Sequence, residues 1–194
     1  MNGDIILGID PGTNLMGYGI LDCRKSQPEI MAMGVIDMRK CKDVYEKLDR
    51  IHQRVTMLAE QFHPSEMAIE APFCGINVQS MLKLGRAQGV AIAAAISHHI
   101  TIAEYAPTKI KMAITGQGGA SKEQVAAMLQ HIFHLDKEAM LPYLDATDAL
   151  GVAYCHYLHR NRPQSTCRGN SWKDFLQQNS NRIYNPTKKM PAKD

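Results

Sequence analysis

The sequence predicts an α/β fold, in which helices cover both faces of a mixed five-stranded sheet. Strand and helix patterns follow one another in the order β-β-β-α-β-α-β-α-α-α over residues 5–159. This order is typical of a sheet that lies between two helical layers. With 194 residues and a hydrophobic content of 45%, the chain is long enough to form one domain with a core of its own.

The first three strands are expected to pair as an antiparallel meander, because only short connections separate them. Residues 5–10 form an apolar run that ends in Asp10, and residues 17–21 give the next strand after a Pro-Gly turn. Apolar residues or glycine at every second position predict a third strand within residues 30–38.

A helix with one apolar face is expected at residues 43–62. The residues of this face recur at helical spacing: they are Val44, Leu48, Ile51, Val55 and Leu58. Pro64 ends the helix, and residues 66–70 give a buried strand that ends in Glu70.

A second helix is expected at residues 77–98, followed by the fifth strand at residues 101–105. Within the helix, Gly85, Gly89 and Ala93 follow one another at four-residue intervals. One helical face is therefore nearly free of side chains, which predicts close packing of this face on a sheet or on another helix.

Three further helices are expected in the C-terminal half of the folded part. Pro107 begins a short helix, and a glycine-rich loop at residues 116–119 follows it. Ser121 with Gln124 three residues later resembles a capped helix start. The last helix is expected at residues 144–159.

Residues 161–194 are predicted to be a flexible, basic tail behind a folded domain of residues 1–160. Polar residues dominate in this segment, and its periodicity is lost. It holds seven Lys or Arg and two Asp, a net charge of +5, whereas the whole chain carries +3. The folded part is therefore not basic, and the tail is expected to attract nucleic acid without regard to sequence.

The composition argues for a protein of the cytoplasm. The longest apolar helical stretch is far shorter than the ~20 residues that a bilayer requires, and the N-terminus shows no signal peptide. The five cysteines are scattered and form no Cys-x-x-Cys pair. They are therefore expected to be reduced thiols rather than a disulfide framework or a zinc site.

Four acidic residues stand at the edges of apolar stretches: Asp10, Glu70, Asp145 and Asp148. An acid at the end of a buried strand is costly unless a partner compensates for its desolvation. Asp145 and Asp148 are three residues apart, so they share one helical face with Cβ atoms roughly 5–6 Å apart. Several acids that converge on one point repel one another unless a divalent cation lies between them. The four residues therefore predict a site for Mg²⁺ or Mn²⁺ that serves phosphodiester hydrolysis.

Each acid also has a purely structural interpretation. Asp10 precedes Pro11 and Gly12, which together form a strong turn signal. Asp145 is a residue type that often caps a helix. Taken singly, each acid is explained better by structure than by catalysis, and only their combination favours the metal site.

Five short motifs follow one another in an order and spacing that resemble one known family. They are Ile-Leu-Gly-Ile-Asp-Pro-Gly-Thr at 6–13, Gly-Tyr-Gly at 17–19, Ala-Ile-Glu at 68–70, Leu-Lys-Leu-Gly-Arg-Ala-Gln-Gly at 82–89 and Asp-Ala-Thr-Asp-Ala-Leu at 145–150. Through them the chain resembles the RuvC family, bacterial crossover junction endodeoxyribonucleases that resolve Holliday junctions. Its predicted topology resembles the ribonuclease H-like fold, and the resemblance covers about residues 4–159.

The resemblance implies a homodimer that nicks two opposed strands of a four-way DNA junction in recombination and DNA repair. Hydrolysis would leave 5′-phosphate and 3′-hydroxyl ends. Asp10, Glu70, Asp145 and Asp148 match the family's metal-binding acids, although some members carry His at the position of Asp145. The family also implies Mg²⁺ with Mn²⁺ as a substitute, two ions in each active site, and association with a RuvA–RuvB branch-migration complex.

Four further residues are candidates for DNA binding. By the resemblance, Phe73 matches an aromatic residue that lies against bases at the junction, and Lys111 and Lys122 match basic positions near substrate phosphates. Lys109, Lys111 and Lys122 flank the glycine-rich loop, where phosphate contacts are expected. A core position for Phe73 and an ordinary solvated surface for each lysine are the structural alternatives.

Three other functions share part of this pattern. A sugar-kinase-like or actin-like ATPase also has an Asp-Gly-Thr turn after its first strand, but such a fold duplicates its core and this chain is too short. A nuclease of the same fold that acts on RNA or on RNA–DNA hybrids is consistent with the acids alone. A non-catalytic nucleic-acid-binding module is disfavoured, because an acidic patch repels phosphate unless metal is bound.

Overall fold

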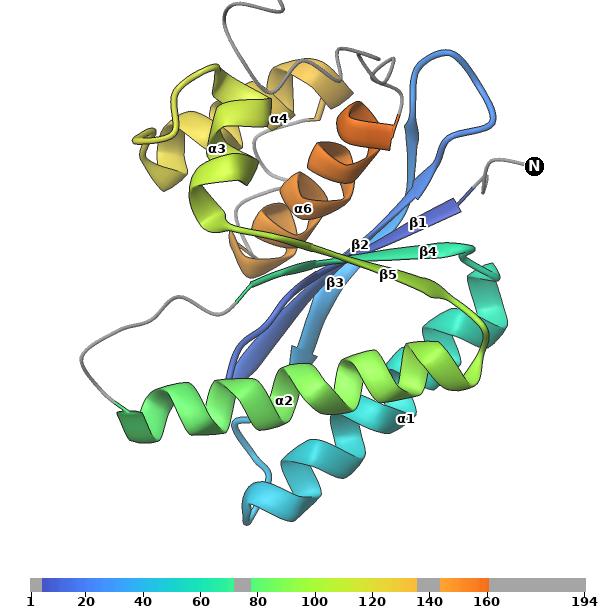
Figure 1. Ribbon diagram of the computed structural model, residues 1–194, viewed down its shortest axis with the longest axis vertical. Coiled ribbons are helices and arrows are strands. Elements are labelled where there is room, and N and C mark those ends of the chain that lie inside the picture. Colours follow the sequence, from blue (N-terminus) through green and yellow to red (C-terminus); the bar gives the residue numbers. More distant parts are fainter. Residues whose placement is uncertain (1–4, 72–77, 136–143, 161–194) are drawn as a thin grey trace, which may run out of the picture. The chain divides into compact units, whose positions relative to one another are not determined.

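The computed structural model describes residues 5–71, 78–135 and 144–160 (Figure 1). The strands are β1 (Ile5–Asp10), β2 (Leu15–Asp22), β3 (Glu29–Asp37), β4 (Glu66–Glu70) and β5 (Thr101–Tyr105). The helices are α1 (Val44–Phe62), α2 (Val78–Ser97), α3 (Pro107–Thr115), α4 (Lys122–Phe133) and α6 (Leu144–Arg160). The predicted order of elements is confirmed, and the second strand is longer at both ends than its sequence pattern indicated.

The strands form one mixed sheet in the order β3-β2-β1-β4-β5. β1 pairs antiparallel with β2, and β2 pairs antiparallel with β3, as expected for a meander. β4 is parallel to both β1 and β5. Consequently β1 and β4 finish at the same end of the sheet, and β2 begins there.

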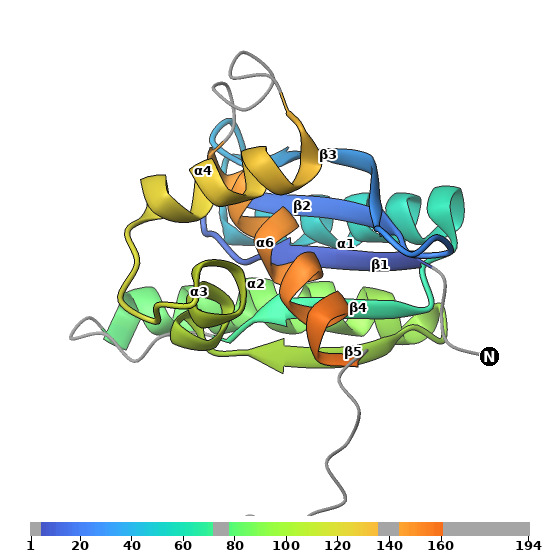
Figure 2. The same cartoon turned by 90° about the horizontal axis from the view of Figure 1, so that it is seen from above.

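Helices cover both faces of this sheet, which confirms the predicted layers. In Figure 1, α3, α4 and α6 lie above the strands, and α1 and α2 lie below them. The strand residues alternate between two separate cores: Ile6 and Ala68 face the layer of α6, whereas Leu7, Met67 and Ile69 face α1 and α2. Seen from above, α6 crosses the strands obliquely (Figure 2).

Local sequence signals account for the helix ends. Asp43 caps α1, and its side chain accepts hydrogen bonds from the amides of Tyr45 and Glu46. Ser121 and Gln124 form the predicted capping box of α4. No helix in the described ranges is long and apolar enough to cross a membrane.

The small-residue face of α2 does not pack on the sheet, so that part of the expectation is wrong. The helix instead buries Ala87, Ala91, Ala94 and Ala95 against α1 and the sheet. Gly85, Gly89 and Ala93 lie on the exposed side, and a Cβ on either glycine would meet open space. Within the described residues of one copy, this face has no packing partner.

Candidate metal centre

Two of the four acids stand on neighbouring strands. Asp10 is the last residue of β1, and Glu70 is the last residue of β4. These strands are parallel neighbours, with Ile9 aligned with Ile69. The backbone therefore brings the two carboxyl groups to the same end of the sheet.

The other two acids lie in the first turns of α6, which approaches the sheet very closely. Gly8 of β1 and Gly17 of β2 make this approach possible. A Cβ on Gly8 would overlap the carbonyl oxygen of Ala149, and a Cβ on Gly17 would overlap that of Asp145. Because Gly17 is the register partner of Asp10, the first turn of α6 lies directly against the strand end that carries Asp10.

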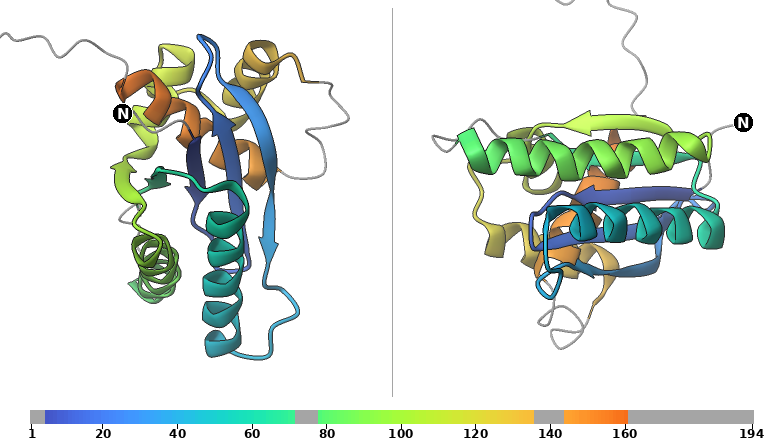
Figure 3. Two further views of the ribbon diagram at one scale, coloured as in Figure 1. Left: turned by 90° about the vertical axis from the view of Figure 1, so that its right-hand side faces the viewer. Right: turned by 90° about the horizontal axis from the view of Figure 1, so that it is seen from below.

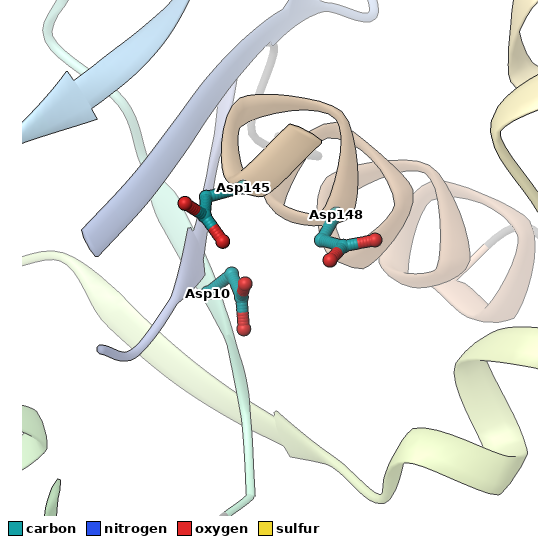
Figure 4. Close-up of side chains that lie close together, drawn as sticks. All are labelled: Asp10, Asp145 and Asp148. Atoms are coloured by element: carbon teal, nitrogen blue, oxygen red, sulfur yellow. The ribbon is translucent and has the colours of Figure 1, made fainter. Parts of the chain in front are cut away.

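As a result, three aspartates from two distant parts of the chain converge. Each of Asp10, Asp145 and Asp148 offers one carboxylate oxygen, and these oxygens lie within 4.8 Å of one another. The three side chains are half-buried and gather between the end of β1 and the start of α6 (Figure 4). Three oxygen ligands at this spacing suit a hard divalent cation such as Mg²⁺.

Glu70 joins this cluster through a shared cavity of about 200 Å³. The lining of the cavity consists of Asp10, Glu70, Pro107, Ile110, Lys111, Lys122, Val125 and Asp148. The cavity is thus acidic on the side of the sheet and α6, and basic on the side of α3 and α4. Acidic residues that could hold a metal here face lysines that could contact a phosphate.

Burial and mutual repulsion perturb the acids in the protein without bound metal. Burial, followed by the charges of Glu70 and Asp148, raises the pKa of Asp10 to about 8. Burial and the charge of Asp148 also raise the pKa of Glu70. A cation between the carboxylates would offset both effects, so the electrostatics as well as the ligand types fit a divalent metal.

The candidate basic residues occupy different places. Lys122, the first residue of α4, places its Nζ atom 2.5 Å from Oδ2 of Asp148. Lys111 lines the cavity. Lys109 is absent from the cavity lining, because its ammonium group lies over the ring of Tyr105, 4.9 Å from the centroid. Phe73 lies outside the described residues.

Two features of the site were missed by the sequence reasoning. The close approach of α6 depends on Gly8 and Gly17, and glycine at a buried strand position is the signal that could have revealed it. The Lys122–Asp148 ion pair joins residues that are 26 positions apart, and no local pattern encodes it.

Comparisons with known proteins agree on one family. The family model described as "Crossover junction endodeoxyribonuclease RuvC" matches residues 6–156. The RuvC endodeoxyribonuclease of Bacteroides fragilis is 59% identical over 179 residues, which cover 92% of this chain and 95% of that protein. The enzyme of the same name from Porphyromonas gingivalis is 54% identical, over 92% of this chain and 96% of its own length.

A solved structure shows the same architecture. It is that of Thermus thermophilus RuvC in complex with a Holliday junction substrate, and it matches with a TM-score of 0.74 and 29% sequence identity. The match covers 80% of this chain and 94% of that one.

Proposed function

The chain belongs to the RuvC family of crossover junction endodeoxyribonucleases, and from this premise we propose that it resolves four-way DNA junctions. The reaction is metal-dependent hydrolysis, which nicks opposed strands and leaves 5′-phosphate and 3′-hydroxyl ends in recombination and DNA repair. The observation that carries the proposal is the convergence of Asp10, Asp145 and Asp148 within 4.8 Å. An RNA-directed nuclease of the same fold is the alternative that the family membership disfavours.

The acids would hold the metal, and the lysines would orient the DNA. Asp10, Asp145 and Asp148 would bind Mg²⁺, with Mn²⁺ as a substitute, and Glu70 would complete a two-ion site from the other strand. A metal held there would supply activation of the attacking water and stabilisation of charge on the leaving oxygen. Lys111 and Lys122 line the same cavity as the acids, and there they would contact and orient the scissile phosphate.

The DNA contacts also extend beyond this cavity. Phe73 would stack on an unpaired base at the junction, which is worth roughly 1–3 kcal/mol. Lys109 is exposed at the start of α3 and would contact a phosphate farther along the strand.

The surface of α2 supports a homodimer. The exposed side of this helix carries an apolar stripe at helical spacing, consisting of Val78, Leu82, Gly85, Gly89, Ala93 and Ile96. Val78, Leu82 and Ile96 are 65%, 60% and 57% exposed, so the stripe would be costly to leave in water. A second copy packed on it would give two active sites related by a two-fold axis, as two symmetric nicks require.

The remaining parts of the proposal concern the chain ends and the cellular setting. Residues 1–160 form the nuclease domain, and residues 161–194 form a basic tail that adds salt-sensitive attraction to DNA. This division is supported by the internal contacts, which divide the chain after Asn161. In the bacterial cytoplasm the enzyme would act with a RuvA–RuvB branch-migration complex.

The direct test compares a labelled four-way junction with a linear duplex that carries the same strands. In Mg²⁺ the protein should nick the junction symmetrically and leave the duplex intact, and EDTA should stop the reaction. Ligase should reseal the nicks, because the ends are 5′-phosphate and 3′-hydroxyl. Equal cleavage of both DNAs, or preference for an RNA–DNA hybrid, would contradict the proposal.

A further inference from the structure

A second cavity lies on the opposite face of the sheet from the metal centre, and it has a volume of about 410 Å³. Its walls come from the turn after β1, the start of α1 and the first half of α2. They consist of Gly12, Thr13, Asn14, Met38, Cys41, Lys42, Asp43, Val44, Lys47, Leu48, Ile51, Lys83 and Ala87. The two helices run side by side and begin at the same end of the sheet (Figure 3).

The cavity has an apolar floor and a basic rim. The floor is formed by Cys41, Val44 and Leu48, which are half-buried and so still present apolar surface to the cavity. Lys42 and Lys83 stand on the rim, and neither ammonium group makes a hydrogen bond or ion pair with another described residue. Asp43 is the only acid among the described residues of the lining. It is engaged in capping α1, where its Oδ1 atom accepts from Tyr45 N at 2.8 Å. The cavity therefore suits a ligand that is flat and apolar on one side and anionic on the other.

The wall nearest the metal centre is fixed by a lysine from α1. The Nζ atom of Lys47 donates to the carbonyl oxygen of Thr13 at 3.0 Å and to Oδ1 of Asn14 at 2.7 Å. The amide of Met38 also donates to the carbonyl oxygen of Asn14 at 2.8 Å. These bonds hold the turn in place, so the cavity wall is preformed.

This turn connects the cavity to the metal centre. Asp10 and Gly12 are two residues apart, so their Cα atoms are separated by at most about 7 Å. Neighbouring nucleotides of a DNA strand are spaced about 3.4 Å apart along the helix axis. A strand whose phosphate lies at Asp10 can therefore reach the cavity within a few nucleotides.

We propose that this cavity is a binding site for one unstacked nucleotide of the substrate strand. Its base lies on the floor formed by Cys41, Val44 and Leu48, and its phosphate lies between Lys42 and Lys83. The site would hold the strand close to the scissile phosphate and would discriminate a distorted junction from a regular duplex, whose bases stay stacked. The inference rests on the proposed function, because it takes junction DNA as the substrate.

The test combines a variant that lacks two positive charges with a series of junctions, each of which lacks one base. The variant is Lys42→Gln with Lys83→Gln, and its control is Lys25→Gln with Lys40→Gln, which removes the same charge from exposed lysines outside the cavity. The substrates are four-way junctions that lack one base, moved nucleotide by nucleotide through the region around the cut. Junction affinity is measured at several salt concentrations, and a melting curve checks that each variant is folded.

The cavity variant should bind the intact junction at least about tenfold more weakly than the control. The slope of the logarithm of its affinity against the logarithm of the salt concentration should be smaller in magnitude by about two. Wild type and control should lose about tenfold in affinity at one position of the missing base, because that base buries apolar area on the cavity floor. The cavity variant should lose less there. A cavity variant that matches the control would overturn the inference. The inference would also be overturned if the cavity variant had a smaller salt slope but no position of the missing base lowered the affinity of wild type. In that case the lysines would contact only the DNA backbone.

Failure of the proposed function would look different. In that case wild type and control would not cleave the intact junction at all. Cleavage by both proteins, together with either contradicting result above, would overturn only the nucleotide site.

Discussion

The Nζ atom of Lys122 lies 2.5 Å from Oδ2 of Asp148, so a lysine from the start of α4 forms an ion pair with an acid of the candidate metal centre. The Asp148 side chain is 18% exposed, whereas that of Lys122 is 65% exposed. The charge of Lys122 also opposes the raised pKa of both Asp10 and Glu70. Lys122 therefore keeps the acids closer to their metal-binding form.

Replacing Lys122 by Gln should lower junction cleavage at neutral pH by about 10–100-fold, as is typical when a partner of a metal ligand is lost. Without this charge the pKa of Asp10 and of Glu70 should rise further, so the rise of the cleavage rate with pH should move to higher pH. The measurement is a pH–rate profile at saturating junction, with Lys25→Gln as the control. Unchanged rates and an unshifted profile would show that Lys122 has no part in the site.

The raised pKa of Asp10 predicts a pH-dependent stability of the metal-free protein. The folded-state pKa is about 8 and the unfolded value is 3.8, so between these limits the folded state binds the additional proton. The stabilisation is therefore fully present below pH 3.8 and is lost as the pH rises through about 8.

This prediction is measured as a difference between two proteins in EDTA. Asp10→Asn lacks the titration, so its free energy of unfolding relative to wild type should increase from about pH 4 to about pH 8 and then stay constant. Saturating Mg²⁺ should remove much of this trend, because metal stabilises the ionised carboxylate. A difference that is constant over this range would contradict the assigned environment of Asp10.

Gly17→Ala should push the first turn of α6 away from the sheet, because the new Cβ would overlap the carbonyl oxygen of Asp145. The cost of overpacking is typically about 1–3 kcal/mol. We expect a lower Tm together with weaker Mg²⁺ binding and slower cleavage. Gly119→Ala is the control, since a Cβ there meets open space; equal behaviour of the two variants would argue against the close contact.

Leu82→Arg should disrupt the proposed dimer, because it places a charge in the middle of the exposed stripe of α2. Sedimentation should then give the 21.6 kDa monomer, and cleavage should lose its symmetry. Met57→Arg on α1 is a matched control, since Met57 is 52% exposed and Leu82 is 60% exposed. A wild-type protein that stays monomeric at micromolar concentration, with or without DNA, would contradict the proposed dimer.

The sequence was sufficient for the order of elements and for the layers, because both follow from local hydrophobic spacing. The positions of Asp10 and Glu70 could also be predicted from the sequence, because each residue ends a buried strand. The structure shows that these strands, β1 and β4, are neighbours in the sheet. Local patterns could not reveal which face of α2 is buried, because alanines and glycines give a weak periodic signal. The Lys122–Asp148 pair and the contact at Gly17 depend on how α4 and α6 pack, which only the tertiary structure shows.

The central claim is that the acid cluster binds the metal that cleaves the DNA. The most direct test is the initial rate of nicking of a labelled four-way junction in Mg²⁺ by Asp10→Asn. Glu70→Gln and Asp148→Asn serve as parallel variants, and Asp49→Asn on the exposed side of α1 is the control. Asp145→Asn is expected to retain some activity, since other family members carry His there. Asp10→Asn should bind the junction yet lose at least about a thousandfold in rate, because metal stabilisation contributes several kcal/mol. Near-normal turnover by Asp10→Asn in Mg²⁺ would contradict the metal centre.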